Sequence, residues 1–102
     1  MQSVKRVEIV ASSVELGKIL AGLDKSGVPR YTVIHNVSGK SDRGTISEDF
    51  AFSSLDNVYV IAFCNPDKID AVIERLSPIL NKFGGACFVS DAMQVEIVRC
   101  VS

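Results

Sequence analysis

The chain has 102 residues, of which 47% are hydrophobic and 23% are charged, and its formal net charge is −1. This length predicts one domain without a separate catalytic or targeting module. The nearly neutral charge provides no basic surface for a polyanion, which argues against nucleic acid as a partner. No apolar run reaches the length of a membrane span, and the first residues lack the apolar core of a secretory signal, so we expect a cytoplasmic protein.

The first quarter of the chain predicts a strand followed by a helix. Residues 5–11 alternate between apolar and polar side chains, as in a strand with one buried face. Ser12 or Ser13 then suits the N-cap of a helix, and leucines and isoleucines follow at helical spacing. Gly27 and Pro29 are expected to end this helix.

Two further strands flank a long polar stretch. Residues 31–37 are rich in β-branched and aromatic side chains, which favours a second strand. The stretch from Ser38 to about Asp56 has no clear periodicity and is long for a connection, and long loops are usually functional or disordered. Residues 58–64 predict a third strand that has no polar face.

The last third of the chain predicts a second helix and a final strand. Asn65 suits an N-cap, with Pro66 in the first helical turn. Pro78 is expected to kink this helix or end it early, although the apolar residues after it favour continued packing. Residues 87–90 and 93–98 predict either a single final strand or a bulged pair.

The predicted order βαββαβ indicates an α+β, ferredoxin-like fold. Right-handed crossovers place both helices on one face of a four-stranded antiparallel sheet. The other face stays uncovered, yet the third strand is apolar on both sides. Leaving such side chains in water would forgo several kcal/mol at about 25 cal/mol per Å², so we expect self-association through the sheet. Periodicity alone does not separate a dimer from a trimer.

Two glycine-bearing turns, Ser38–Gly44 and Lys82–Ala86, border predicted strands. Their backbone N–H groups are candidates to converge on an anionic ligand. Gly39-Lys40-Ser41 is not a Walker A motif, because a strand precedes it and a loop follows. Gly84 and Gly85 have an alternative role as the end of the second helix.

Neither the histidine nor the cysteines indicate catalysis. His35 is the single histidine, and a structural role on its strand is favoured over metal binding. The spacing of the three cysteines matches no zinc motif, and no nucleophile has a recognisable histidine partner. We therefore expect a protein that is not an enzyme and that holds no permanent cofactor.

Several segments together resemble one known family. Ser26-Gly27, residues 31–33 and residues 39–43 are similar to the first helix end, second strand and T-loop entrance of PII-like signalling proteins. Residues 85–99 resemble the end of the PII B-loop and the last strand of that family. The resemblance implies a single domain over residues 1–102, with a T-loop at about 39–56 and a short B-loop at about 82–86. It also implies a homotrimer that binds an adenine nucleotide in each of three intersubunit clefts.

The resemblance further assigns roles to individual residues. It places Thr32 and Cys64 near the base, and it implies that Arg99 reaches in from the neighbouring subunit. The residues that it places around the phosphates are Gly39, Lys40, Ser41, Asp42, Arg43, Gly84 and Gly85.

Departures from the family pattern bear on the choice of ligand. Ala86 stands where the family has its B-loop lysine, and Ile97 stands where it has the first of two arginines. Each missing cation removes a contact of about 1.5–3 kcal/mol, and a γ-phosphate depends most on such contacts. ADP or AMP is therefore favoured over ATP. Residues 45–50 have no counterpart of the modified tyrosine of nitrogen-regulatory PII proteins, which argues against uridylylation and a 2-oxoglutarate response.

The closer resemblance is to PII-like proteins linked to bicarbonate uptake and carboxysomes. These proteins sense adenine nucleotides and, in some members, bicarbonate, which implies a membrane transporter or a carboxysome-associated protein as partner. Two alternatives stay open. One is a metal-linked trimer of the copper-tolerance type, with His35 and a cysteine thiolate as ligands, and the other is an oligomeric scaffold without a small ligand.

Overall fold

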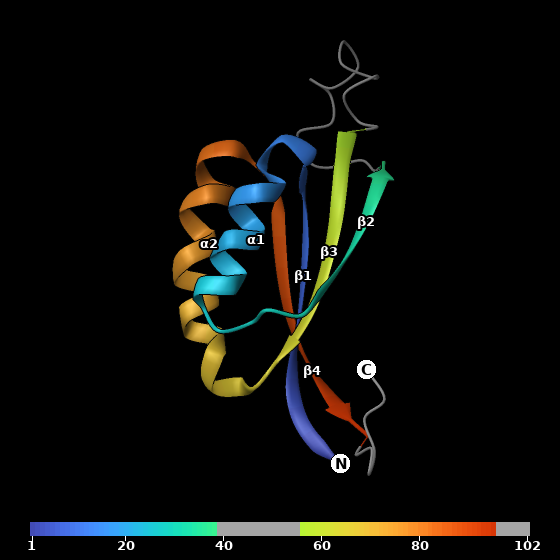
Figure 1. Ribbon diagram of the computed structural model, residues 1–102, viewed down its shortest axis with the longest axis vertical. Coiled ribbons are helices and arrows are strands. Elements are labelled where there is room, and N and C mark those ends of the chain that lie inside the picture. Colours follow the sequence, from blue (N-terminus) through green and yellow to red (C-terminus); the bar gives the residue numbers. More distant parts are fainter. Residues whose placement is uncertain (39–55, 96–102) are drawn as a thin grey trace.

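The computed structural model describes residues 1–38 and 56–95. Four strands form one antiparallel sheet in the order β2-β3-β1-β4, and both helices cover the same face of it (Figure 1). The predicted βαββαβ, ferredoxin-like fold is therefore confirmed. The elements are β1 (Gln2–Ser12), α1 (Leu16–Lys25), β2 (Tyr31–Val37), β3 (Asn57–Cys64), α2 (Ile69–Phe83) and β4 (Ala86–Gln94).

The core lies between the helices and the sheet, and strand β1 provides its centre. Val7, Ile9 and Ala11 alternate onto the helix-covered face and are at most 3% exposed. The other buried residues of this cluster come from both helices, the α1–β2 connection and β3: Ile19, Leu23, Val28, Val58, Val60, Ala62, Cys64, Val72 and Leu76. No helix in the described ranges is both long enough and apolar enough to span a membrane.

The start of the first helix follows its predicted cap. The Ser12 hydroxyl accepts a hydrogen bond from the Val14 backbone N–H at 3.4 Å, which starts a short 3-10 turn ahead of α1. The helix ends at Lys25, and Gly27 takes a left-handed φ of 83° two residues later. The chain then turns back towards the sheet through Val28, which is buried.

Pro78 does not end the second helix early, so that part of the prediction was wrong. Helix α2 continues through Pro78 to Phe83. Proline leaves the carbonyl four residues earlier without its helical donor. That carbonyl belongs to Glu74, and both Glu74 and Pro78 are exposed, so water is available to bind it.

Gly84 and Gly85 end α2 and start β4. The Gly84 N–H donates to the Leu80 carbonyl at 2.8 Å, and both glycines have positive φ, 87° and 126°. A Cβ on Gly85 would lie 2.7 Å from the Val10 carbonyl oxygen and 2.9 Å from a Leu80 methyl group. These two glycines therefore have a structural role in ending α2, because the backbone requires glycine there whether or not a ligand binds.

The final strand is single and regular, which settles the alternative between one strand and a bulged pair over residues 87–94. Strand β4 pairs with β1 without interruption from Ala86↔Val10 to Gln94↔Gln2. Residues 96–98 of the predicted strand lie outside the described residues. The irregularity occurs instead in β2, where the register shifts between His35 and Val37 and Asn36 has a φ of 60°.

The face of the sheet away from the helices carries exposed apolar side chains on all four strands, as the sequence predicted. Because direct cross-strand partners share a face, the register places this set opposite the core. We call it the helix-free face, and its large apolar members are Val10, Ile34, Tyr59, Ile61, Phe63 and Phe88. Ile34 is 46% exposed, Phe63 53% and Phe88 61%. Such a surface is typical of a face that another chain covers.

Candidate functional site

A pocket of about 610 Å³ opens at the end of the sheet where β2 begins. Its walls come from the α1–β2 connection and from all four strands, although these segments are far apart in sequence. Residues that line it include Arg30, Thr32, Ile61, Phe63, Ala92 and Met93. A volume of this size is in the range of small-ligand sites.

Thr32 and Cys64, both predicted near a base, lie on opposite faces of the sheet. Thr32 pairs with Ile61 on the helix-free face and lines the pocket. Cys64 is 8% exposed and belongs to the core cluster between the helices and the sheet. Burial, with a smaller contribution from the Asp67 charge, raises the pKa of the Cys64 thiol. Cys64 is therefore an uncharged core thiol, and only Thr32 of this pair faces the pocket.

Gly84 and Gly85 lie far from the pocket within one chain. They precede β4 at the edge of the sheet, at the end where Ala86 pairs with Val10. Strand β2 occupies the opposite edge, three strand spacings or about 14 Å away. The two glycine turns of the sequence analysis therefore do not start from adjacent positions in one subunit. The other predicted ligands lie outside the described residues: Gly39, Lys40, Ser41, Asp42, Arg43 and Arg99.

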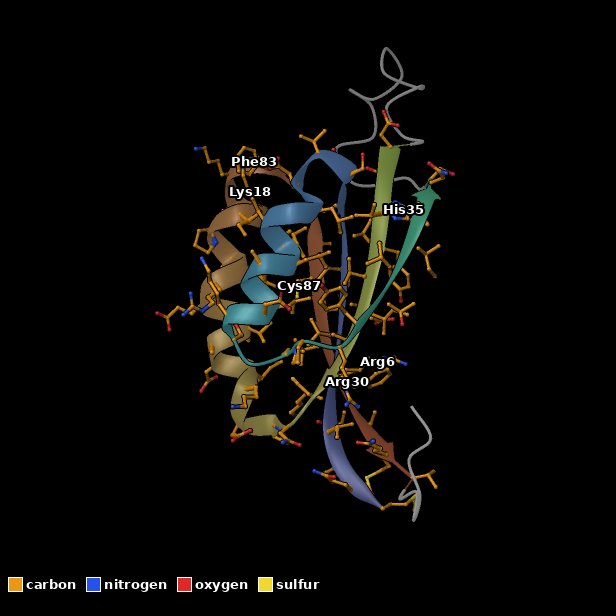
Figure 2. All side chains as sticks on the ribbon, in the orientation of Figure 1. Arg6, Lys18, Arg30, His35, Phe83 and Cys87 are labelled. Atoms are coloured by element: carbon orange, nitrogen blue, oxygen red, sulfur yellow. The ribbon has the colours of Figure 1, made fainter. Side chains whose placement is uncertain are left out.

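Arg30 is a pocket residue that the sequence analysis missed. It is exposed, directly precedes β2 and is the one charged residue among the described residues of the pocket lining. Figure 2 shows it at the start of β2, far from Phe83 and close to Arg6 in this view. Only its position after Pro29, where the chain enters a strand, marks it in the sequence.

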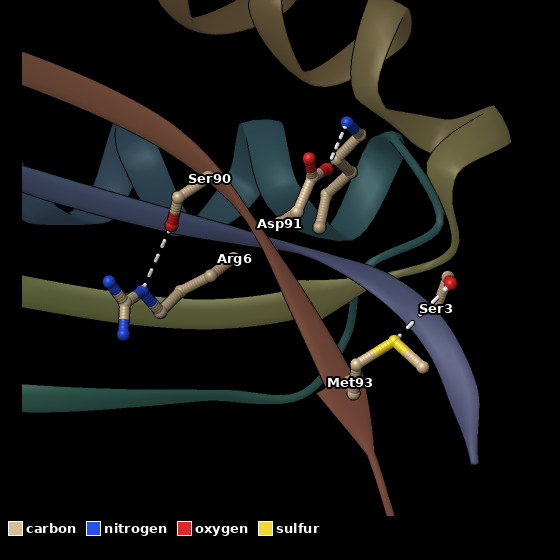
Figure 3. Close-up of polar contacts among 6 residues, drawn as sticks. Ser3, Arg6, Ser90, Asp91 and Met93 are labelled. Atoms are coloured by element: carbon tan, nitrogen blue, oxygen red, sulfur yellow. Dashed lines mark hydrogen bonds and ion pairs between the residues drawn. The ribbon is translucent and has the colours of Figure 1, made fainter.

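A polar cluster lies among the apolar side chains of the helix-free face. The Tyr59 hydroxyl donates a short hydrogen bond to Glu8, and the other Glu8 oxygen lies 3.8 Å from Arg6 Nε. Arg6 Nε also donates to Ser90 Oγ at 3.2 Å (Figure 3). Arg6 and Glu8 balance each other's charge, so this cluster adds no net charge to the face. On the other side of β1, the Lys5 ammonium contacts Asp91 at 2.5 Å.

Tyr59 is expected to make the stability of the protein sensitive to alkaline pH. The hydrogen bond to Glu8, followed by burial and the Glu8 charge, raises the pKa of Tyr59 above its usual 10.0. Because the pKa of Tyr59 is higher in the folded state, its protonated hydroxyl stabilises the protein at pH values below the unfolded-state pKa. This stabilisation is lost as the pH rises through the folded-state pKa. We expect Tyr59→Phe to show a smaller fall in Tm than wild type between pH 9 and pH 11.5.

The comparison is made by differential scanning fluorimetry across that range. Tyr31→Phe serves as a control for the loss of any tyrosine hydroxyl. If wild type and Tyr59→Phe lose Tm in parallel, Tyr59 does not contribute to the alkaline transition.

Comparisons with known proteins identify the family of this chain and find solved structures with the same fold. The model of the family "Nitrogen regulatory protein P-II" matches residues 4–101. The chain belongs to the P-II family. Among curated proteins, none matched it.

Solved structures of CPII, a nitrogen regulatory PII-like protein from Thiomonas intermedia K12, are similar to this chain. The complex of CPII with ADP, AMP and bicarbonate has a TM-score of 0.75 and 23% identity, covering 89% of this chain and 87% of CPII. The complex with ADP and bicarbonate has a TM-score of 0.76 and 24% identity, with 89% and 87% covered. The apo form has a TM-score of 0.73 and 22% identity, with 89% and 90% covered. At this level of identity, the likeness establishes the fold.

Within the described residues, the metal-linked alternative has no ligand set inside one subunit. His35 pairs with Val58 at the start of β3, whereas Cys64 ends that strand six residues later, about 20 Å away. Burial raises the pKa of the Cys87 thiol, which keeps it uncharged as well. In residues 1–38 and 56–95, no three His, Cys, Asp or Glu side chains are grouped to hold a metal ion.

Proposed function

We propose that this P-II family protein is a regulator that binds an adenine nucleotide, with ADP or AMP favoured over ATP. The observation that carries the proposal is the pocket beside Thr32 in a chain that matches the P-II family over residues 4–101. The missing cations at Ala86 and Ile97 favour ligands with fewer phosphates. The similar CPII structures contain ADP and AMP, which supports the same ligands here.

We further propose a cytoplasmic homotrimer in which three copies bury the helix-free face. In one chain, the pocket and the Gly84-Gly85 turn are at opposite ends of the sheet. A neighbouring copy would have to supply any second wall that contacts the phosphates. This geometry supports nucleotide sites between subunits, with Arg99 reaching in from the neighbour as the family resemblance implies.

Bicarbonate is proposed as a second ligand, because the CPII complexes contain it together with ADP. The T-loop at about 39–56 is proposed as the effector surface, and the short B-loop at about 82–86 as part of the nucleotide site. Ligand phosphates would favour one T-loop conformation, and that conformation would bind or release a partner. The proposed partner is a membrane transporter of inorganic carbon or a carboxysome-associated protein.

Calorimetric titration of the purified protein with ATP, ADP, AMP and cyclic AMP tests this function. We expect ADP or AMP to bind most tightly, and Arg99→Ala to weaken binding roughly 10-fold or more through loss of a charge-assisted contact. A change in affinity on adding bicarbonate would support the carbon-uptake branch. Absence of binding by every nucleotide would overturn the nucleotide proposal and favour a scaffold.

A further inference from the structure

A cation and an exposed aromatic ring both lie where β2 begins. Tyr31 pairs with Ala62 at the start of β2, and Arg30 and Phe63 are the residues next to this pair along the two chains. Both line the pocket. Alternation along β3 puts Phe63 on the same face as Ile61, which is the cross-strand partner of Thr32.

Phe63 is unusually exposed, and Arg30 has no polar partner among the described residues. The Phe63 side chain belongs to the most apolar strand, yet it is 53% exposed. Within the described residues, Arg30 makes no hydrogen bond or ion pair, whereas the nearby Arg6 contacts both Ser90 and Glu8. A planar ligand with an anionic group would contact both free side chains at once.

We infer that Phe63 stacks on the base of the nucleotide and that Arg30 contacts its phosphate. This assignment rests on the proposed adenine-nucleotide function and names the residues of one chain that hold the ligand. Aromatic rings bind bases through their faces, and guanidinium groups match phosphate oxygens in charge and geometry. Thr32 lies beside the pair and supplies a hydroxyl for the polar edge of the base.

Arg30 also provides a phosphate contact in a chain that lacks two others. Ala86 and Ile97 are uncharged, and Gly84-Gly85 lies at the far end of the sheet from this pocket. One arginine in the same chain would contact the phosphate that AMP and ADP share. The binding affinities for AMP and for ADP are therefore expected to depend on Arg30 to a similar extent.

The test compares AMP and adenosine on Arg30→Gln and Phe63→Leu. We expect Arg30→Gln to weaken the binding of AMP and ADP roughly 10- to 100-fold. The binding of adenosine should be unchanged, because adenosine has no phosphate. We expect Phe63→Leu to weaken the binding of adenosine and of AMP alike, by about 10-fold, through loss of stacking on the base. Calorimetry measures the nucleotides directly, and adenosine is measured by competition with AMP.

Two matched variants control for charge and for aromatic content. Arg75→Gln removes an exposed charge from α2, and Phe88→Leu removes an exposed ring from the helix-free face outside the pocket lining. Arg75→Gln is expected to bind AMP as wild type does, and Phe88→Leu is expected to do so at a protein concentration where light scattering gives it the mass of wild type. If wild type binds AMP and the Arg30 and Phe63 variants bind it equally well, this assignment is overturned while the proposed function stands. If wild type binds no adenine nucleotide, both are overturned.

Discussion

The Gly85→Ala variant is expected to be less stable than wild type by about 2–4 kcal/mol. Gly85 has a φ of 126°, which a residue with a side chain adopts only under strain, and its Cβ would lie 2.7 Å from the Val10 carbonyl oxygen. That oxygen belongs to the backbone of β1 and moves only if the central strand moves. The difference is measured by urea unfolding at one fixed protein concentration, because assembly also contributes to stability.

Gly17→Ala is the matched control, with the opposite expected sign. Gly17 lies inside α1, and nothing stands within 4 Å of the Cβ that alanine would add. Alanine favours a helix over glycine by about 0.5–1 kcal/mol, so this variant should be more stable than wild type. Equal stability of Gly85→Ala and wild type would mean that the α2–β4 junction shifts freely and that Gly85 is not required there.

The Ile34→Asp variant is expected to dissociate the proposed trimer. Ile34 is 46% exposed on the helix-free face, and covering an aspartate there would bury a charge without a partner. An uncompensated buried charge costs about 3–5 kcal/mol, so the dissociation constant should rise at least about 100-fold. Light scattering after size-exclusion chromatography reports the mass of the assembly.

Ile73→Asp makes the same chemical change on the other side of the molecule. Ile73 is 45% exposed on α2, so the two isoleucines match in exposure and differ in the layer that they occupy. This variant should keep the mass of wild type. A trimer that persists in Ile34→Asp would show that the helix-free face is not the surface through which the copies associate.

The fold could be predicted because the evidence for it is local. Alternation in β1, helical spacing in α1 and the uniformly apolar β3 each determine one element, and the crossover rule then arranges them. The early helix end at Pro78 was wrongly predicted, because the effect of a proline depends on whether water reaches the carbonyl that it frees. That exposure follows from the tertiary structure, in which Glu74 and Pro78 face outward.

The candidate site was harder to predict, since the sheet assembles it from distant segments. Thr32 was identified through the family resemblance, but its neighbour Phe63 is 31 residues away and becomes adjacent only through the β2–β3 register. The hydrogen bond from Tyr59 to Glu8 likewise joins residues 51 positions apart. Such contacts depend on register, and periodicity indicates a strand without indicating its partner.

The central position of β1 also affects how this chain folds. One edge of β1 pairs with β3, and the other pairs with β4, with partners as distant in sequence as Gln2 and Gln94. Pairings of such long sequence separation are slow to form, because loop closure precedes the contacts that stabilise them. On the ribosome, the second edge of β1 stays open until β4 has been made. Folding intermediates that expose this edge are therefore the species most prone to pair with another chain and aggregate.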